Sequence, residues 1–342
     1  MKTARLVLAA ALCALALCTN LFAAETDYSD VPAEHWAWES IHKATEAGLV
    51  QGTGGGRFGL GQEITRASYA AMLCRLMGWE EVTPPYGSFT DNRDNAKWYY
   101  AAIETAWANG ALFVQGTECY PDEVIDREEM AASLVRALGY QTLSGLAQDE
   151  CPFEDVTVNR GYIALAFRMG LVNGTKEGVF SPHGRCTREQ AATVLVRAWE
   201  RLHREPVKLT PAPEHAVFAQ ALEGTAGPVP ASPRAGLESV CTAALEAGED
   251  GCVAVHTAPF SQRVGADGSV SAGENLTQEE LEALLSDPNT AVYRSERYES
   301  SYLILPARDG TATVVWFESA EDLAEKVRLC ALLGVGSVCF VP

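Results

Sequence analysis

The segment YSDVPAEHWAWESIHKATEAGLVQGTGGGRFGLGQEITRASYAAMLCRLMG, residues 28–78, decides the fold because the chain contains two further versions of it. The second version opens with FTDN at Phe89, and the third opens with FEDV at Phe153. One arginine recurs in all three at a constant interval, at positions 66, 127 and 188. Because one such unit cannot bury its apolar face alone, we expect the three to pack on one another around a shared core.

Each copy predicts a helix, a loop and a second helix. In the first copy Trp36, Ile41 and Ala44 fall on one helical face together with Leu49, and Gly48 ends that helix. The loop that follows is rich in glycine and polar residues. The three copies together predict an all-α bundle.

The second helix of each copy has a capping signal at its start. Thr or Asp stands at the N-cap, and Glu129 and Gln190 follow three residues later in the second and third copies, which completes a capping box. Ser68 takes that position in the first copy, so the box there is half formed.

The recurring arginine stands at the first position of these second helices. A helix start exposes unpaired backbone N–H groups and a partial positive charge, and the arginine adds a planar fork of donors that fits carboxylate or phosphate. The copies therefore predict three anion sites, at Arg66, Arg127 and Arg188. The alternative is that each arginine only stacks on a neighbouring copy or pairs with an acid there. Trp36 precedes Gly48 by the same interval as Trp98 precedes Gly110, which favours a saccharide site, although either Trp could instead be core.

The composition of the chain limits its partners. There are 26 basic and 45 acidic residues, a net charge of −19. A chain this acidic repels nucleic acid and anionic membranes on average, so an anionic ligand has to be held by local charge. The sequence has no zinc-type cysteine cluster and no phosphate-binding glycine loop, so we predict neither metal nor cofactor.

The start of the chain, positions 1–24, predicts an export signal. Lys2 and Arg5 precede an uncharged apolar run at 6–17, and Ala23 and Ala24 offer a cleavage point. Lipid attachment at Cys18 is the alternative. Without Lys2 and Arg5 the net charge is near −21, since 24 basic residues then face 45 acidic ones. Eight of the ten cysteines remain, and because several lie in apolar patterns we expect buried free thiols rather than disulfides.

These landmarks resemble the S-layer homology repeat of bacterial surface proteins. The matching motifs are the openings YSDV, FTDN and FEDV, the aromatic positions in HWA and KWY, the GLVQGT-like turns, and ITRAS, IDREE and CTREQ, which are similar to the family's TRAE signature. The resemblance covers residues 28 to about 202, and it implies a pseudo-threefold helical bundle with ligand grooves between adjacent repeats. It implies non-covalent attachment to a secondary cell-wall polysaccharide, a peptidoglycan-linked glycan whose terminal sugar is often pyruvylated and therefore carries a carboxylate.

The resemblance also implies roles for individual residues. Three arginines would contact the carboxylate, three aspartates would orient the sugar or the groove, two tryptophans would wall it, and three glycines would allow close backbone approach: Arg66, Arg127, Arg188, Asp30, Asp91, Asp155, Trp36, Trp98, Gly52, Gly116 and Gly174. The third copy is three residues shorter between its aspartate and Gly170, and it has Val158 where a Trp is expected. We therefore expect its groove to be the weakest.

The C-terminal third predicts a small α/β domain after a Pro/Ala-rich linker. We expect helices near 236–248, 278–285 and 320–333, strands at 252–256, 301–305, 311–317 and 337–341, and a hairpin turn at Asp309-Gly310. Residues 314–342 resemble the closing segment of family 18 (chitinase-type) glycoside hydrolases. The DxxDxDxE catalytic run of that family is absent from the chain, and about 107 residues are too few for a full barrel of about 250. We therefore expect a reduced, non-catalytic relative of a TIM barrel.

The sequence leads to one main hypothesis and two alternatives. The main hypothesis is a secreted, wall-anchored binding module at the cell surface, with no membrane insertion after signal cleavage. The alternatives are a wall-anchored glycosidase acting on chitin-like or peptidoglycan glycans, and a lattice-forming S-layer subunit. The expected parts are a signal peptide at 1–24, repeats at 28–79, 86–140 and 151–202, a linker at 203–235 and an α/β domain at 236–342.

Overall fold

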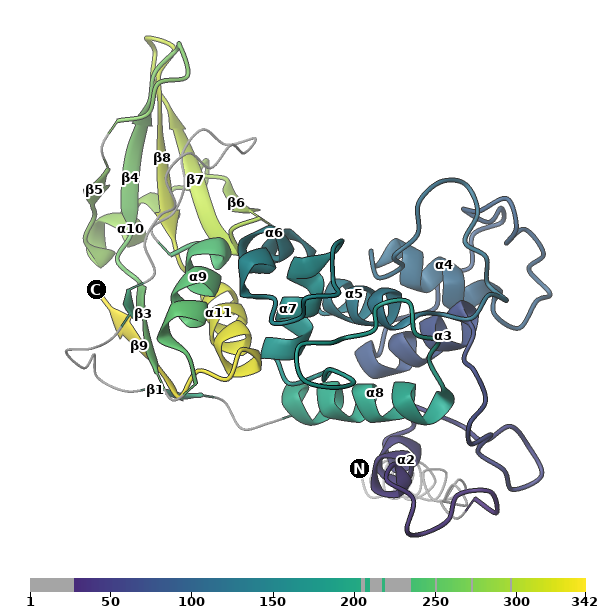
Figure 1. Cartoon of the computed structure of the whole chain (residues 1–342). Helices are drawn as coiled ribbons and strands as arrows, with labels where there is room; N and C mark the ends of the chain where they lie inside the picture. The colour runs from purple at the N-terminus through teal and green to yellow at the C-terminus, as the bar shows by residue number, and fades with distance from the viewer. Residues whose placement is uncertain are drawn as a thin grey trace, which may run out of the picture. The chain divides into compact units, whose positions relative to one another are not determined.

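The computed structural model describes residues 28–203, 207–209, 217–218, 235–249, 251–271, 273–295 and 297–342 (Figure 1). The expected signal peptide and most of the expected linker lie outside the described residues. The chain divides into two compact units, one formed by residues up to 130 with 183–197, and one formed by 131–182 with 198–342. The expected repeat and domain boundaries stay a prediction.

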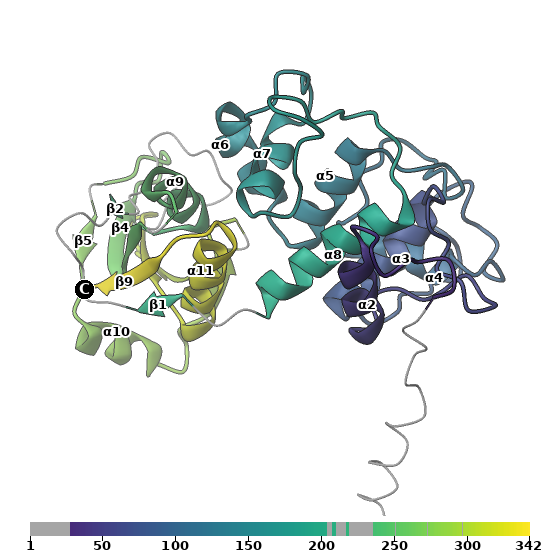
Figure 2. The same cartoon turned by 60° about the horizontal axis from the view of Figure 1, so that its bottom comes forward.

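The first unit is helical. It contains α2 (Trp38–Glu46), α3 (Arg66–Met77) and α4 (Tyr100–Ala108), and the first residues of α5 (Arg127–Ala137) and α8 (Arg188–Leu202). Figure 2 shows α3 and α4 packed side by side. As the capping signals predict, α3, α5 and α8 each begin at the recurring arginine. The caps of α3 and α5 form, since the Thr65 hydroxyl accepts from Ser68 N–H at 3.2 Å and the Asp126 carboxylate accepts from Glu129 N–H at 2.8 Å. The capping box expected at α8 is only half formed, because the Gln190 side chain accepts from Thr187 N–H at 3.1 Å but the buried Thr187 hydroxyl makes no hydrogen bond with any described residue.

Three short segments just before these helices are joined in a closed ring of hydrogen bonds. Ile125 N–H donates to the Ile64 carbonyl at 3.0 Å, Cys186 N–H donates to the Ile125 carbonyl at 3.1 Å, and Ile64 N–H donates to the Cys186 carbonyl at 2.9 Å. A second ring surrounds it, in which the N–H of each recurring arginine binds a carbonyl four residues before the next arginine: Arg66 to Glu123, Arg127 to Gly184 and Arg188 to Gln62. Each copy therefore contacts both others.

The core of the first helix differs from the expectation in one residue. Ile41, Ala44 and Leu49 are buried as predicted, but Trp36 lies in the turn before α2 with 62% of its surface exposed. The prediction that Trp36 shares their buried face is wrong, because the helix begins two residues after it.

The second unit contains the remaining helices and all the named strands. After α5 the chain forms two 3₁₀ turns (Gln141–Leu143 and Gln148–Glu150) around the short α6 (Ser144–Ala147), and then α7 (Arg160–Arg168). The C-terminal part adds α9 (Leu237–Ala247), α10 (Gln278–Leu285) and α11 (Ala320–Leu332). Its strands are β1 (Lys208–Leu209), β2 (Val217–Phe218), β3 (Cys252–His256), β4 (Phe260–Val264), β5 (Glu274–Asn275), β6 (Val292–Ser295), β7 (Ser300–Pro306), β8 (Ala312–Phe317) and β9 (Ser337–Val341).

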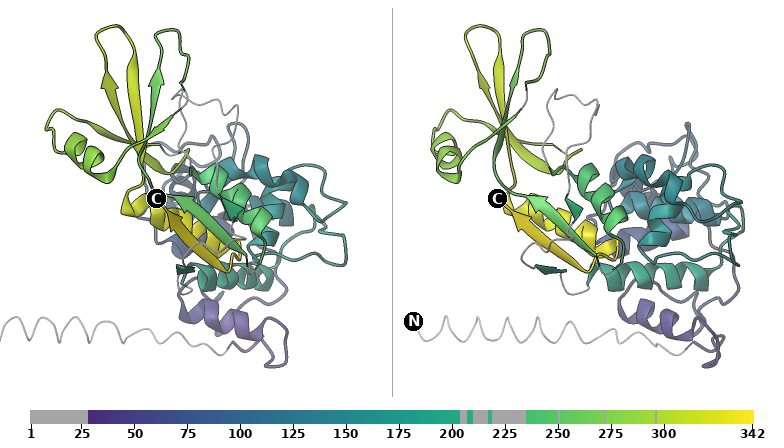
Figure 3. Two further views of the ribbon diagram at one scale, coloured as in Figure 1. Left: turned by 90° about the vertical axis from the view of Figure 1, so that its left-hand side faces the viewer. Right: turned by 60° about the vertical axis from the view of Figure 1, so that its left-hand side comes forward.

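The strands form two sheets. A parallel sheet has the order β1-β9-β3-β2, and an antiparallel sheet has the order β5-β4-β8-β7-β6. Because side chains alternate along a strand, β8 presents Val315 and Phe317 to Leu281 of α10, and Trp316 to Phe260 on the opposite face. Figure 3 shows the strands of the antiparallel sheet with α10, in green, beside them. The chain is therefore helical first and α/β afterwards, as expected. The relation of the α/β part to a barrel stays a prediction.

The local signals of the C-terminal part are confirmed. The three expected helices and four expected strands match α9, α10, α11, β3, β7, β8 and β9 within two residues, and Asp309-Gly310 forms the turn between β7 and β8. Thr277 and Ser319 both make capping boxes. Sequence reasoning missed β4, in which only Phe260 is buried, and β6, in which three of the four residues are exposed, because neither segment shows a clear apolar alternation.

The eight cysteines outside the expected signal are free thiols, as expected. Seven are buried and Cys74 is partly exposed. Burial raises the pKa of the Cys119, Cys186, Cys241 and Cys330 thiols to about 12, so these groups stay protonated and unreactive at neutral pH.

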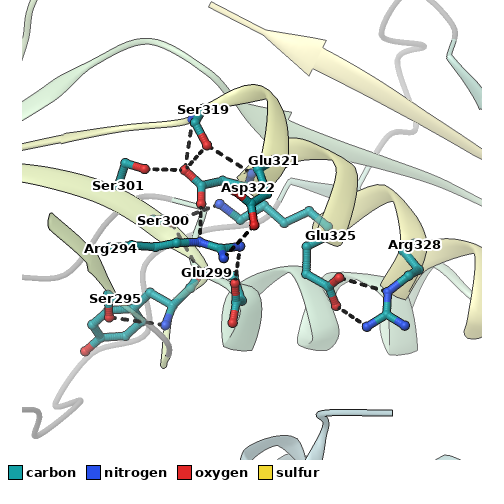
Figure 4. Close-up of polar contacts among 12 residues, drawn as sticks. Arg294, Ser295, Glu299, Ser300, Ser301, Ser319, Glu321, Asp322, Glu325 and Arg328 are labelled. Atoms are coloured by element: carbon teal, nitrogen blue, oxygen red, sulfur yellow. Dashed lines mark hydrogen bonds and ion pairs between the residues drawn. The ribbon is translucent and has the colours of Figure 1, made fainter. Parts of the chain in front are cut away.

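A charged network is buried between α11 and the β7–β8 pair. The Lys326 side chain is fully buried, donates to the Ser300 hydroxyl at 2.9 Å and pairs with Glu318. One turn earlier, buried Asp322 accepts from the Ser301 hydroxyl at 2.7 Å and pairs with Arg294 at 3.0 Å (Figure 4). Burial raises the pKa of Glu318 to about 7, although Lys326 and the Ser300 hydroxyl act to lower it.

Candidate functional site

Arg66 is held by the second repeat. Its guanidinium forms a two-point ion pair with Glu129, with one N–H···O distance of 2.8 Å, and donates to the carbonyls of Cys119 at 2.9 Å and Tyr120 at 2.6 Å. The side chains of Arg66 and Glu129 are only 11% and 13% exposed. Burial lowers the pKa of Arg66, but the hydrogen bond and charge of Glu129 raise it above its usual value, so the group stays charged. Its donors already have protein acceptors.

Arg188 holds the first repeat by equivalent backbone contacts. Its guanidinium donates to the Phe58 carbonyl at 3.0 Å and to the Gln51 carbonyl at 2.8 Å, and it lies 5.1 Å from the centre of the Phe58 ring. Phe58 precedes Arg66 by eight residues, as Cys119 precedes Arg127. Arg66 and Arg188 therefore make the same kind of contact with the loop of the next repeat in the ring.

The two arginines differ in their acidic partner. Glu129, the third residue of α5, pairs with Arg66. The corresponding residue of α3 is Ser68, which has no charge, and its hydroxyl lies 3.0 Å from the Thr65 hydroxyl. Arg188 therefore shares its groove with the uncharged Ser68, at the position where Arg66 has the carboxylate of Glu129.

An open groove of about 580 Å³ lies beside Arg188, within the range of about 300–1,000 Å³ typical of small-molecule sites. Its walls come from the first-repeat loop, from α3, from Trp98 before α4 and from the start of α8, and none of the lining residues is acidic: Gln51, Gly52, Thr53, Ser68, Ala71, Met72, Arg75, Trp98 and Arg188. Arg75 adds a second guanidinium. Burial and the charge of Arg75 lower the pKa of Arg188. The groove therefore offers two positive charges beside an aromatic ring.

The three recurring aspartates hold the loops of their own repeats. Asp30 accepts from the N–H groups of Phe58 at 2.7 Å, Gly59 at 2.8 Å and Leu60 at 3.1 Å. Asp91 accepts from the N–H groups 28 and 29 residues later, and Asp155 from those 25 and 26 residues later. The shift of three residues matches the shorter third copy. Burial acts to raise the pKa of Asp30, but these backbone N–H groups lower it overall.

The recurring glycines serve loop packing. A Cβ on Gly52 would come within 2.8 Å of the Tyr28 ring and 2.7 Å of the Arg57 carbonyl, and one on Gly174 would come within 2.7 Å of the Phe153 ring. Gly116 instead has a φ of +93°, which a residue with a side chain rarely adopts. Close approach at the glycine is present in two copies, and in both it involves the aromatic residue that opens the same copy, Tyr28 or Phe153.

The aromatic positions lie on the surface in all three copies. Trp36, Trp98 and Val158 are 62%, 66% and 62% exposed. The alternative that either Trp is core is therefore wrong. Trp98 lines the Arg188 groove, and its ring makes an edge contact with Tyr99 at 5.4 Å between ring centres.

Arg75 is the groove residue that sequence reasoning missed. A signal was available, because Arg75, Arg136 and Arg197 recur at the same interval as the helix-start arginines. Among the described residues no group of His, Cys, Asp and Glu is placed to hold a metal ion. No helix in that part of the chain combines the length and the apolar character needed to cross a bilayer.

The family model of the S-layer homology domain matches residues 27–70 and 152–192 of the chain. The chain is 29% identical to an amylopullulanase of Thermoanaerobacterium thermosulfurigenes over 187 residues, 53% of this chain and 10% of that protein. It is 30% identical to an S-layer protein of Bacillus thuringiensis subsp. finitimus over 205 residues, 59% of this chain and 24% of that protein.

The chain thus spans no more than about a quarter of the length of these relatives. Among solved structures, the Bacillus cereus spore cortex-lytic enzyme SleL aligns with 31% of this chain and 25% of its own, at 15% identity and a TM-score of 0.26. Because that score is below 0.5, we base no argument on this likeness.

Proposed function

We propose that the chain anchors itself non-covalently to the bacterial cell wall by binding an acidic wall saccharide in the Arg188 groove. The observation that carries the proposal is the neighbourhood of Arg188, where two guanidiniums and an exposed Trp line an open groove without any carboxylate. On a chain of net charge −19, such a groove concentrates the positive charge that an anionic polymer needs. The S-layer homology domains and the S-layer relatives support a place at the cell surface.

The three copies have different roles in this proposal. Arg188 contacts the acidic group, Trp98 stacks on a sugar ring, and Asp30 and Gly52 shape the loop that forms one wall. At the equivalent position between the first and second repeats, Arg66 is already paired with Glu129. That ion pair holds the two repeats together and does not bind the saccharide. We further infer a pseudo-threefold bundle of the repeats at 28–79, 86–140 and 151–202, supported by the two hydrogen-bonded rings.

The wall partner is an anionic secondary polysaccharide, and the carboxylate of a pyruvylated sugar is one acidic group that can meet Arg188. The C-terminal α/β domain is displayed by the anchor, and its non-catalytic character stays a prediction.

Binding to purified walls tests the proposal. We expect the chain to co-sediment with intact walls and to lose more than about tenfold in affinity when mild acid removes the pyruvate ketals, because a charge-assisted hydrogen bond contributes about 1.5–3 kcal/mol. Walls carried through the same steps without acid serve as the control. Undiminished binding to walls stripped of every acidic group would contradict the proposal.

A further inference from the structure

Arg75 places an exposed cation on the wall of the groove. It lies on α3 with its side chain exposed, and within the described residues its guanidinium makes no hydrogen bond or ion pair. Arg66, nine residues earlier on the same helix, has an ion pair and two carbonyl acceptors. A long cation kept on the wall of a groove without a protein partner is available to a ligand.

Arg75 and Arg188 act on the same space. Both line the groove, and the positive charge of Arg75 makes Arg188 harder to protonate, which places the two guanidiniums within electrostatic reach of each other. No acidic residue lines the groove itself, where Ser68 stands at the position that Glu129 has in the second repeat, and the carboxylates that act on Arg188, Asp30 and Glu189, lie outside that lining. A ligand with one negative charge leaves one of the two guanidiniums unmatched.

We propose that the Arg188 groove selects a saccharide unit that carries two negative charges, with Arg188 binding one and Arg75 the other. This inference rests on the proposed function and specifies its ligand. The shared chemistry is a dianionic group on a sugar, which is either a phosphate monoester or two carboxylates on neighbouring units. Arg75 is then a specificity residue, since a single carboxylate engages Arg188 without it.

Four probes separate these cases when the whole chain without its signal is titrated and tryptophan fluorescence is followed, because Trp98 lies in the groove. Glucose 6-phosphate and digalacturonic acid carry two charges at pH 8, and glucose 6-sulfate and galacturonic acid carry one. We expect the better dianion to bind about tenfold more tightly than its monoanionic counterpart, the worth of one further charge-assisted hydrogen bond. Which dianion is preferred identifies the source of the charge.

The charge of the phosphate probe can also be changed without changing its shape. The second pKa of a phosphate monoester is about 6, so the probe is largely a monoanion at pH 5 and a dianion at pH 8. If the phosphate is the preferred probe, its affinity rises over this range, whereas the sulfate ester, which keeps one charge, shows no such rise. If digalacturonic acid is preferred, its advantage over galacturonic acid at pH 8 takes the place of this readout.

Arg75→Gln should abolish the advantage of the dianion over its monoanionic counterpart, because Arg188 then meets either probe alone. Arg308→Gln removes the same charge from an exposed residue outside the groove and should leave that advantage unchanged. Equal affinity for mono- and dianionic probes, or an advantage that survives Arg75→Gln, overturns the inference and leaves the anion-binding function standing. Failure of every acidic probe to bind the folded chain overturns both.

Discussion

Arg188→Gln should lower the affinity of the chain for intact walls by about thirtyfold, whereas Arg66→Gln should leave the affinity of the folded chain nearly unchanged. Arg188 faces an open groove, and losing one charge-assisted contact to an acidic sugar is worth about 2 kcal/mol. The donors of Arg66 are already taken by Glu129 and two carbonyls, so they are not available to a ligand. Co-sedimentation with walls over a range of protein concentrations measures both affinities.

The two variants should show the reverse order in stability. Arg66→Gln leaves the largely buried Glu129 without its cation and should cost about 3 kcal/mol in the free energy of unfolding. Arg188→Gln loses hydrogen bonds to two loop carbonyls and should cost about 1–2 kcal/mol. Arg188→Lys, which keeps the charge but not the planar fork, should bind between the wild type and Arg188→Gln. Equal loss of wall affinity in Arg66→Gln and Arg188→Gln would refute the assignment.

Lys326→Met should destabilise the α/β domain by about 3–5 kcal/mol at pH 8, the largest effect on stability that we expect from a single substitution. The substitution removes the cation from a site where Glu318 is only 6% exposed, and it leaves that carboxylate with the hydrogen bond from the Ser300 hydroxyl but without its countercharge. Urea unfolding followed by circular dichroism measures the loss.

The cost should depend on pH in a defined direction. The pKa of Glu318 is raised by burial to about 7 in the wild type, and loss of Lys326 raises it further. A carboxyl whose pKa is higher in the folded state stabilises the fold at low pH, where it is protonated, and that contribution is lost as pH rises through the folded pKa. Lys326→Met should therefore cost least below pH 4.5 and most above pH 7. The double variant Lys326→Met/Glu318→Gln should recover most of the loss at pH 8; a cost independent of pH would show that the pair is not the cause.

Much of the fold follows from local signals. The N-caps of α3, α5 and α8 place the recurring arginine at the first helical position, and the capping boxes at Thr277 and Ser319 mark α10 and α11. These signals act over three or four residues, so they can be recognised in the sequence. Trp36 is predicted on the wrong face because it fits the helical spacing but stands before the helix begins.

The site was less accessible to sequence reasoning. Three similar arginines predict three similar anion sites, and the missing Trp at Val158 predicts that the third repeat is the weakest. In the structure the arginines differ instead in the residue that each one contacts in the neighbouring repeat. Arg66 pairs with Glu129, which is 63 residues away in the chain. Pairing over that distance depends on how the repeats close, which no local pattern contains. Arg188 belongs to the third repeat, but its groove is built by residues of the first two.

The affinity of Ser68→Glu for intact walls tests the central claim most directly. The substitution gives the first repeat the residue that pairs with Arg66 in the second, and a carboxylate in the first turn of α3 is favourable to the helix dipole, so it should not weaken the fold. We predict that the new carboxylate pairs with Arg188 and lowers wall affinity by more than about tenfold, while Ser68→Gln, of similar size and without charge, stays within about threefold of the wild type. Wall binding by Ser68→Glu equal to that of Ser68→Gln would contradict the claim that Arg188 binds the wall.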